Sequence, residues 1–79
     1  MELNTFVQLF AAQFDNTPDD QFHPELAFRE LEEWSSLVAL SVIAMVDDEF
    51  NVQLDGDDIR NSKTIKDIFT IVKSKMNDV

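Results

Sequence analysis

The sequence predicts an all-α protein: a small four-helix bundle of three longer helices and one short helix, with a long loop between the first two helices. Apolar residues recur at helical spacing in three stretches of the chain. One Gly and two Pro are few turn-forming residues for a many-stranded sheet. Hydrophobic residues make up 44% of the 79 residues, which is enough for a core despite a net charge of -10. At this length we expect one domain, covering residues 1–79.

The first helix is predicted over residues 3–15, where apolar residues follow a helical repeat: Leu3, Phe6, Val7, Phe10 and Phe14. Pro18 ends it, because proline disfavours helical geometry at the residue before it. Residues 16–35 form the predicted long loop, whose apolar residues we expect to fasten it to the core: Phe22, Leu26, Phe28, Leu31 and Trp34. The loop length also predicts that the first two helices run nearly parallel, since a short turn would make them antiparallel.

The second helix is predicted from Ser36 to about Asn51. Ser35 is the predicted N-cap, because a serine oxygen readily accepts an N–H of the first helical turn. Ser36 is then the first helical residue, with its hydroxyl in solvent. One arc of the helix, as wide as a core-facing stripe, holds Ala39, Val42, Ile43, Val46 and Phe50.

The opposite side of this helix combines apolar, hydroxyl and acidic residues: Ser36, Leu37, Leu40, Ser41, Ala44, Asp47 and Asp48. We expect Leu37 and Leu40 to be exposed beside the Ser36 hydroxyl. A small apolar patch ringed by acids suits a docking surface, and the alternative is an over-hydrophobic helix in a tight bundle. Asp47 and Asp48 lie near the C-terminal end, where the helix dipole disfavours negative charge.

Residues 52–61 are predicted to form a turn and a short helical piece, with Leu54 and Ile59 pointing inward. The last helix begins at Ser62 or Thr64 and runs to about residue 75. Its apolar residues again repeat at helical spacing: Ile65, Ile68, Phe69, Val72 and Met76.

The charge of the chain indicates which partners it can have. Its pI is near 4.1, and residues 30–58 contain nine acids and no Lys or Arg. Nucleic acids and anionic membrane surfaces would repel such a chain, so we expect protein partners with basic patches. No cysteine, signal-peptide pattern or membrane-length apolar run is present, and we expect a cytoplasmic monomer without membrane insertion.

The residues offer little for catalysis or metal binding. His23 is the only histidine, and nothing in the sequence places it near Ser36 with an orienting acid. Residues 51–62 place Gly56 as in a calcium-binding loop, but Ser62 stands where a bidentate Glu is needed. We therefore expect neither an enzyme nor a metal site.

At Trp34-Ser35-Ser36-Leu37 and the helix that follows, the chain resembles acyl carrier proteins of the discrete, type II kind. The family motif is Asp-Ser-Leu at the start of the second helix, which ends in an acidic cluster and a Phe. This sequence has Ser35-Ser36-Leu37 and then Asp47-Asp48-Glu49-Phe50 at the family's spacing. The resemblance continues through residues 54–59 and 64–65, and more loosely through the first helix, so it covers essentially the whole chain.

The resemblance implies a carrier rather than a catalyst. Ser36 would receive 4'-phosphopantetheine from coenzyme A through a separate phosphopantetheinyl transferase. The thiol of this arm would hold acyl intermediates of fatty-acid, polyketide or related biosynthesis as thioesters. Four residues fall on positions that family members present to partner enzymes: Leu37, Leu40, Asp47 and Asp48.

Two positions depart from the family pattern. Ser35 replaces the motif Asp, which keeps a helix cap but removes a charge that helps to orient the serine at the transferase. Ser35 could also compete with Ser36 as the acceptor. Ser41 stands where an acid is common. The alternative function is therefore an unmodified acidic adaptor that keeps the carrier fold.

Overall fold

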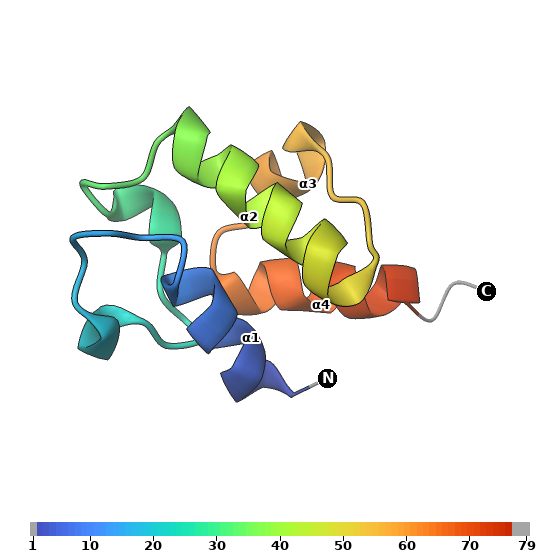
Figure 1. Ribbon diagram of the computed structural model, residues 1–79, viewed down its shortest axis with the longest axis horizontal. Coiled ribbons are helices and arrows are strands. Elements are labelled where there is room, and N and C mark those ends of the chain that lie inside the picture. The colour runs from blue at the N-terminus through green and yellow to red at the C-terminus, as the bar shows by residue number, and fades with distance from the viewer. Residues whose placement is uncertain (1, 77–79) are drawn as a thin grey trace.

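A computed structural model describes residues 2–76. Its helices are α1 (Leu3–Ala11), α2 (Ser36–Phe50), α3 (Gly56–Arg60) and α4 (Ile65–Met76), and two short 3-10 helices lie between α1 and α2 (Asp19–Gln21 and Phe28–Glu30). Figure 1 shows the helices packed into one bundle with the long loop at one end. Over the described range there is no strand beyond one isolated bridge. The predicted all-α fold of three longer helices and one short helix is confirmed.

Helix α1 ends earlier than predicted, at Ala11 instead of residue 15. A continued helix would direct the N–H groups of Asp15 and Asn16 to carbonyls four residues back. Instead, both N–H groups donate to the Glu33 carboxylate, at 2.6 and 3.0 Å. The chain unwinds there, and Phe14 is still buried.

Helices α1 and α2 run in opposite directions in Figure 1, so the prediction that they are nearly parallel is wrong. The loop between them doubles back through its two 3-10 helices. A connection of this length imposes no direction on the helices that it joins.

The long loop is fastened to the rest of the protein in two ways. Its apolar side chains pack into or against the core, as predicted, and Phe28 is completely buried. Its backbone also completes the start of α4, because the N–H groups of Ile65 and Lys66 donate to the carbonyls of Leu26 and Pro24.

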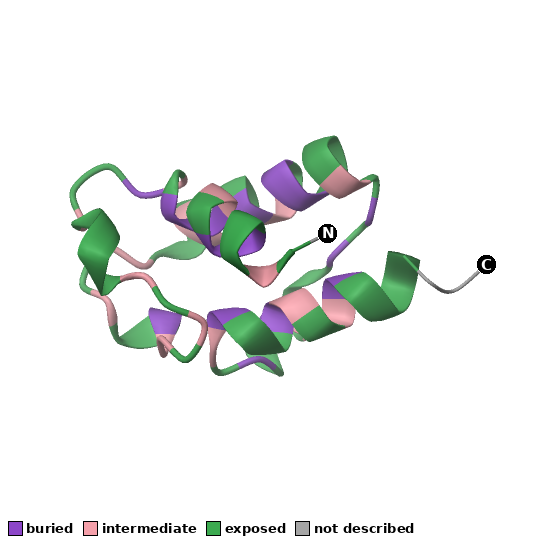
Figure 2. Ribbon diagram, turned by 90° about the horizontal axis from the view of Figure 1, so that it is seen from below, coloured by how far each residue is buried: buried purple, intermediate pink, exposed green. Residues whose placement is uncertain are grey.

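The core is built mainly from aromatic rings and branched aliphatic side chains. Phe10 is completely buried and lies within 6.5 Å, centroid to centroid, of five other aromatic rings: Phe6, Phe14, Phe22, Phe28 and Trp34. Figure 2 shows the buried residues on the facing sides of the helices. These rings join α1 to the loop, and Phe6 connects them to α4 through Phe69, at 5.6 Å between ring centroids.

The core-facing stripe of α2 is only partly as predicted. Val42 and Val46 are completely buried, but Ala39, Ile43 and Phe50 are half-buried. Met45, which the predicted stripe omits, is buried. The half-buried side chains of Ala39 and Ile43 line a groove beside α3, because that five-residue helix is too short to cover α2.

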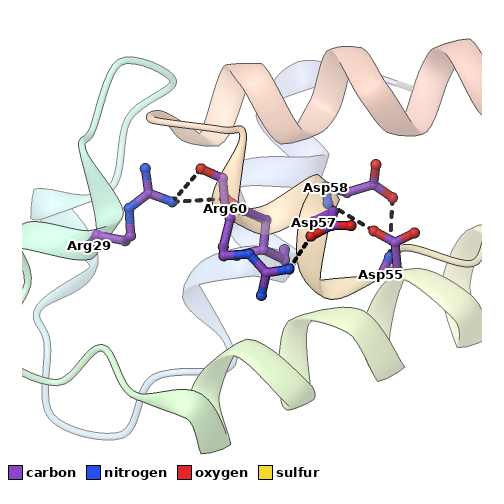
Figure 3. Close-up of polar contacts among 6 residues, drawn as sticks. Arg29, Asp55, Asp57, Asp58 and Arg60 are labelled. Carbon is purple, nitrogen blue, oxygen red and sulfur yellow. Dashed lines mark hydrogen bonds and ion pairs between the residues drawn. The ribbon is translucent and has the colours of Figure 1, made fainter.

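The segment after α2 folds as predicted, with Leu54 and Ile59 buried. Asp55 and Asp58 form a capping box, in which each carboxylate accepts the backbone N–H of the other residue. Figure 3 shows this box at the start of α3. Lys75 donates to Asp58 at 2.8 Å and lowers the pKa of that carboxyl, which ties α3 to α4.

Helix α4 begins after Thr64, one of the two predicted starts. The N–H of Asp67 donates to the Thr64 hydroxyl oxygen, and the Asp67 carboxylate accepts the N–H groups of Lys63 and Thr64. Ser62, the other predicted start, is buried instead and donates to the carbonyl of Asp58 at 2.9 Å.

Candidate functional site

The first turn of α2 presents two consecutive serines that do different things. Ser35 is the N-cap, as predicted: its backbone is extended, and its hydroxyl oxygen accepts the N–H of Val38 at 3.3 Å. Ser36 is the first helical residue and is exposed. Both serines are exposed, and the structure assigns the capping role to Ser35.

An apolar groove begins at these serines and runs between α2 and α3. It measures about 550 Å³, within the ~300–1,000 Å³ typical of small-molecule sites. Most of its lining is apolar, and its charged residues are both arginines: Arg29, Trp34, Ser35, Ser36, Ala39, Leu40, Ile43, Gly56, Ile59 and Arg60. The groove can accept a slender, mainly apolar chain that starts at Ser36.

The four residues of α2 that are predicted to contact partners are exposed. Leu37 is 77% exposed and Leu40 is 60% exposed, and both stand close to Ser36 along the helix. Asp47 and Asp48 are exposed at the other end of α2. Asn51 then ends the helix in a left-handed conformation, with φ of 56°. We call these four residues, Leu37, Leu40, Asp47 and Asp48, the α2 face.

The start of α2 has no acid in its first turn. Glu33 is the carboxylate that precedes it most closely in sequence, but it is held by the start of the loop that follows α1. The Thr17 hydroxyl donates to it at 2.7 Å, and this bond, together with the N–H groups of Asp15 and Asn16, lowers the pKa of Glu33. No carboxylate of the first turn therefore competes for the positive end of the α2 dipole, which favours a bound phosphate there.

Sequence reasoning missed most residues of the groove. Arg29 and Arg60 received no role, and Gly56 was considered only in a calcium-binding loop. Four apolar residues were predicted only as core or loop-anchoring residues: Trp34, Ala39, Ile43 and Ile59. The one signal in the sequence was that Gly56 is the only glycine. The structure shows why a glycine fits, because a Cβ at Gly56 would lie 3.3 Å from the Arg60 guanidinium.

The structure also places the histidine and the acidic side chains relative to Ser36. His23 lies 3.8 Å from Glu25, and both side chains are largely exposed, away from the groove that contains Ser36. In the part of the chain that the structure describes, no three His, Cys, Asp or Glu side chains are placed to hold a metal ion. None of the described helices is long and apolar enough to cross a membrane.

Comparison with known proteins identifies one family. A family model described as "Phosphopantetheine attachment site" matches residues 4–72. The matched range extends from α1 into α4 and contains both serines and the groove. Searches of curated proteins and of solved structures found no match.

Proposed function

The chain belongs to the phosphopantetheine attachment site family, and from this premise we propose that Ser36 is the attachment residue. The protein is a carrier and not an enzyme, and its cofactor is covalently bound 4'-phosphopantetheine. The group supplies a thiol, which this cysteine-free chain lacks, and that thiol holds acyl groups as thioesters. We further propose that residues 1–79 act as one carrier domain.

The observation that carries the choice of serine is the division of roles at the start of α2. Both side chains are exposed and line the groove, but the Ser35 oxygen accepts the Val38 N–H as the helix cap, whereas Ser36 is the first helical residue. In the transfer step the Ser36 oxygen forms a bond to the phosphorus that carries pantetheine, and a pyrophosphate P–O bond of coenzyme A breaks. Adenosine bisphosphate leaves, and the hydroxyl proton passes to a base of the transferase.

The residues around Ser36 fit the group that the family carries. A phosphodiester on Ser36 would lie at the positive end of α2, where the first turn contains no acid. The apolar part of the arm matches the lining of the groove, including Trp34, Ile43 and Ile59. This chain's own contribution is to orient the arm and to exclude water along one side of it.

Carriers of this family interact with a phosphopantetheinyl transferase and with acyl-processing enzymes. We propose that these enzymes dock on the α2 face through basic patches, in fatty-acid, polyketide or related biosynthesis, and that the carrier acts as a cytoplasmic monomer. Acids give long-range steering, while Leu37 and Leu40 supply a small apolar contact. Such docking is expected to weaken as salt is added.

The proposal is tested by intact-mass measurement after incubation with coenzyme A and a broad-specificity transferase. The expected gain is the mass of one 4'-phosphopantetheine group, present in Ser35→Ala and absent in Ser36→Ala. A gain that survives Ser36→Ala and disappears in Ser35→Ala would overturn the assignment of the serine. No gain with several transferases would favour the adaptor function, which the missing motif Asp makes the second candidate.

A further inference from the structure

The groove at Ser36 contains both arginines of a chain that is otherwise strongly acidic. Arg29 is committed to the end of α3: its Nη1 donates to the carbonyl of Ile59 at 2.8 Å and to that of Arg60 at 3.3 Å. Its guanidinium carbon also lies 5.5 Å from the centre of the Phe28 ring. Arg29 therefore holds the loop against α3.

Arg60 is placed differently. Its side chain is 72% exposed, and within residues 2–76 it pairs with Asp57, in an ion pair on the same short helix. Figure 3 shows the Arg60 guanidinium on the side of α3 that faces α2. An exposed ion pair of this kind contributes little to stability, so a second anion can take over the guanidinium readily.

The only glycine of the chain leaves room for this guanidinium. A Cβ on Gly56 would lie 3.3 Å from Arg60 Nη1, closer than most Cβ contacts. The φ of Gly56 is not positive, so its backbone conformation does not require glycine. The space that Gly56 leaves is used by Arg60 at the wall of the groove.

We propose that Arg60 binds the phosphodiester through which the arm is joined to Ser36, and that this contact holds the arm along the groove between α2 and α3. This inference rests on the proposed function and assigns a positioning role to a residue of this chain. Its basis is charge complementarity. The phosphodiester is anionic, Ser35 places no carboxylate beside it, and Arg60 and Ser36 line the same groove.

The proposal makes Asp57 a competitor for Arg60. Without the arm, the guanidinium pairs with Asp57, and with the arm attached it is shared with the phosphodiester. A guanidinium can donate two parallel N–H bonds to phosphate oxygens, which Lys cannot do. Asp57→Asn is therefore expected to strengthen the contact, whereas Arg60→Gln removes it.

The test compares the protein before and after modification at Ser36, with modification verified by mass. Because there are two arginines, side-chain Nε–H signals in an NMR spectrum report separately on Arg60 and on Arg29, which serves as the internal reference. Trp34 lines the groove and is the only tryptophan, so quenching of its fluorescence by acrylamide reports whether the arm covers it. Lys66→Gln is the matched control, since it removes one positive charge from an exposed site on α4 outside the groove.

We expect the Arg60 signal to shift on modification while that of Arg29 stays in place, and quenching of Trp34 to fall. In Arg60→Gln, the arm should no longer protect Trp34 from quenching by acrylamide. Lys66→Gln should keep this protection, and Asp57→Asn should increase it. If Ser36 is modified but the Arg60 signal and the Trp34 quenching are unchanged, the proposal is overturned while the attachment site stands. If Ser36 is not modified, both proposals fail together.

Discussion

Leu37→Ala, on the α2 face, is expected to weaken the binding of partner enzymes without weakening the fold. The Leu37 side chain is 77% exposed at the start of α2, so the folded protein alone gains little from it. Leu37→Ala should therefore change the free energy of unfolding by no more than about 0.5 kcal/mol. Its effect should appear only when a partner covers the residue.

The size of that effect follows from the apolar surface that is removed. Leu→Ala deletes three carbon atoms, each equivalent to a CH₂ group worth about 0.8 kcal/mol when it is fully buried. If the transferase covers Leu37 completely, the binding free energy falls by about 2 kcal/mol, which corresponds to a roughly 30-fold weaker complex. Half coverage gives about 1 kcal/mol and roughly a five-fold loss.

The assay is transferase kinetics on the unmodified protein, together with urea unfolding. Leu37→Ala should raise KM with kcat unchanged, because the contact is equal in the ground state and the transition state. Met76→Ala is the control, since Met76 is also an exposed large apolar residue but lies at the end of α4. An unchanged KM for Leu37→Ala, or a loss of stability well above 0.5 kcal/mol, would refute the reasoning.

Three further predictions concern stability. Ser35→Ala should lower the free energy of unfolding by about 1 kcal/mol, because the Val38 N–H loses its acceptor, while Ser36→Ala should leave it nearly unchanged in urea unfolding. The pKa of Glu33 is lower in the folded protein than its unfolded-state value near 4.5. The ionised Glu33 carboxylate therefore stabilises the fold fully above pH 4.5, and this stabilisation is lost as the pH falls through the folded-state pKa. Thermal melts at a series of pH values should show this loss of stability, and Glu33→Gln should abolish the pH dependence that Glu33 causes. Phe28→Ala should lower the free energy of unfolding by about 3–5 kcal/mol, because the ring is completely buried. A thermal melt followed by circular dichroism should show a large drop in Tm.

The local features of the fold were predictable from the sequence. The start of α2 depends on one capping serine and the turn that follows it, and the exposure of Leu37 and Leu40 depends only on helical periodicity. The end of α1 was not predictable, because it is decided by a carboxylate that lies 18 residues further along the chain from Asp15. The direction of α2 relative to α1 was not predictable either, since a long loop leaves it open.

The same distinction holds for the candidate site. Ser36 and the α2 face lie on one helix, so helical spacing alone predicts how they are placed relative to one another. Arg60 and Gly56 are 20 or more residues away from Ser36 in sequence and reach the groove only through the packing of α3. No local pattern predicts that packing. The acidic composition of the chain also gives no reason to predict a positively charged group in the groove.

The replacement of the motif Asp by Ser35 has different consequences for folding and for charge. The cap is kept, because the serine oxygen still accepts the Val38 N–H. The charge is lost, and the charged groups that line the groove are then two guanidinium groups. A carboxylate at position 35 would compete with a phosphodiester on Ser36 for Arg60, and it would also repel that phosphodiester. A neutral cap and an arginine across the groove therefore act together: both favour an anion at Ser36, in a chain whose net charge is -10.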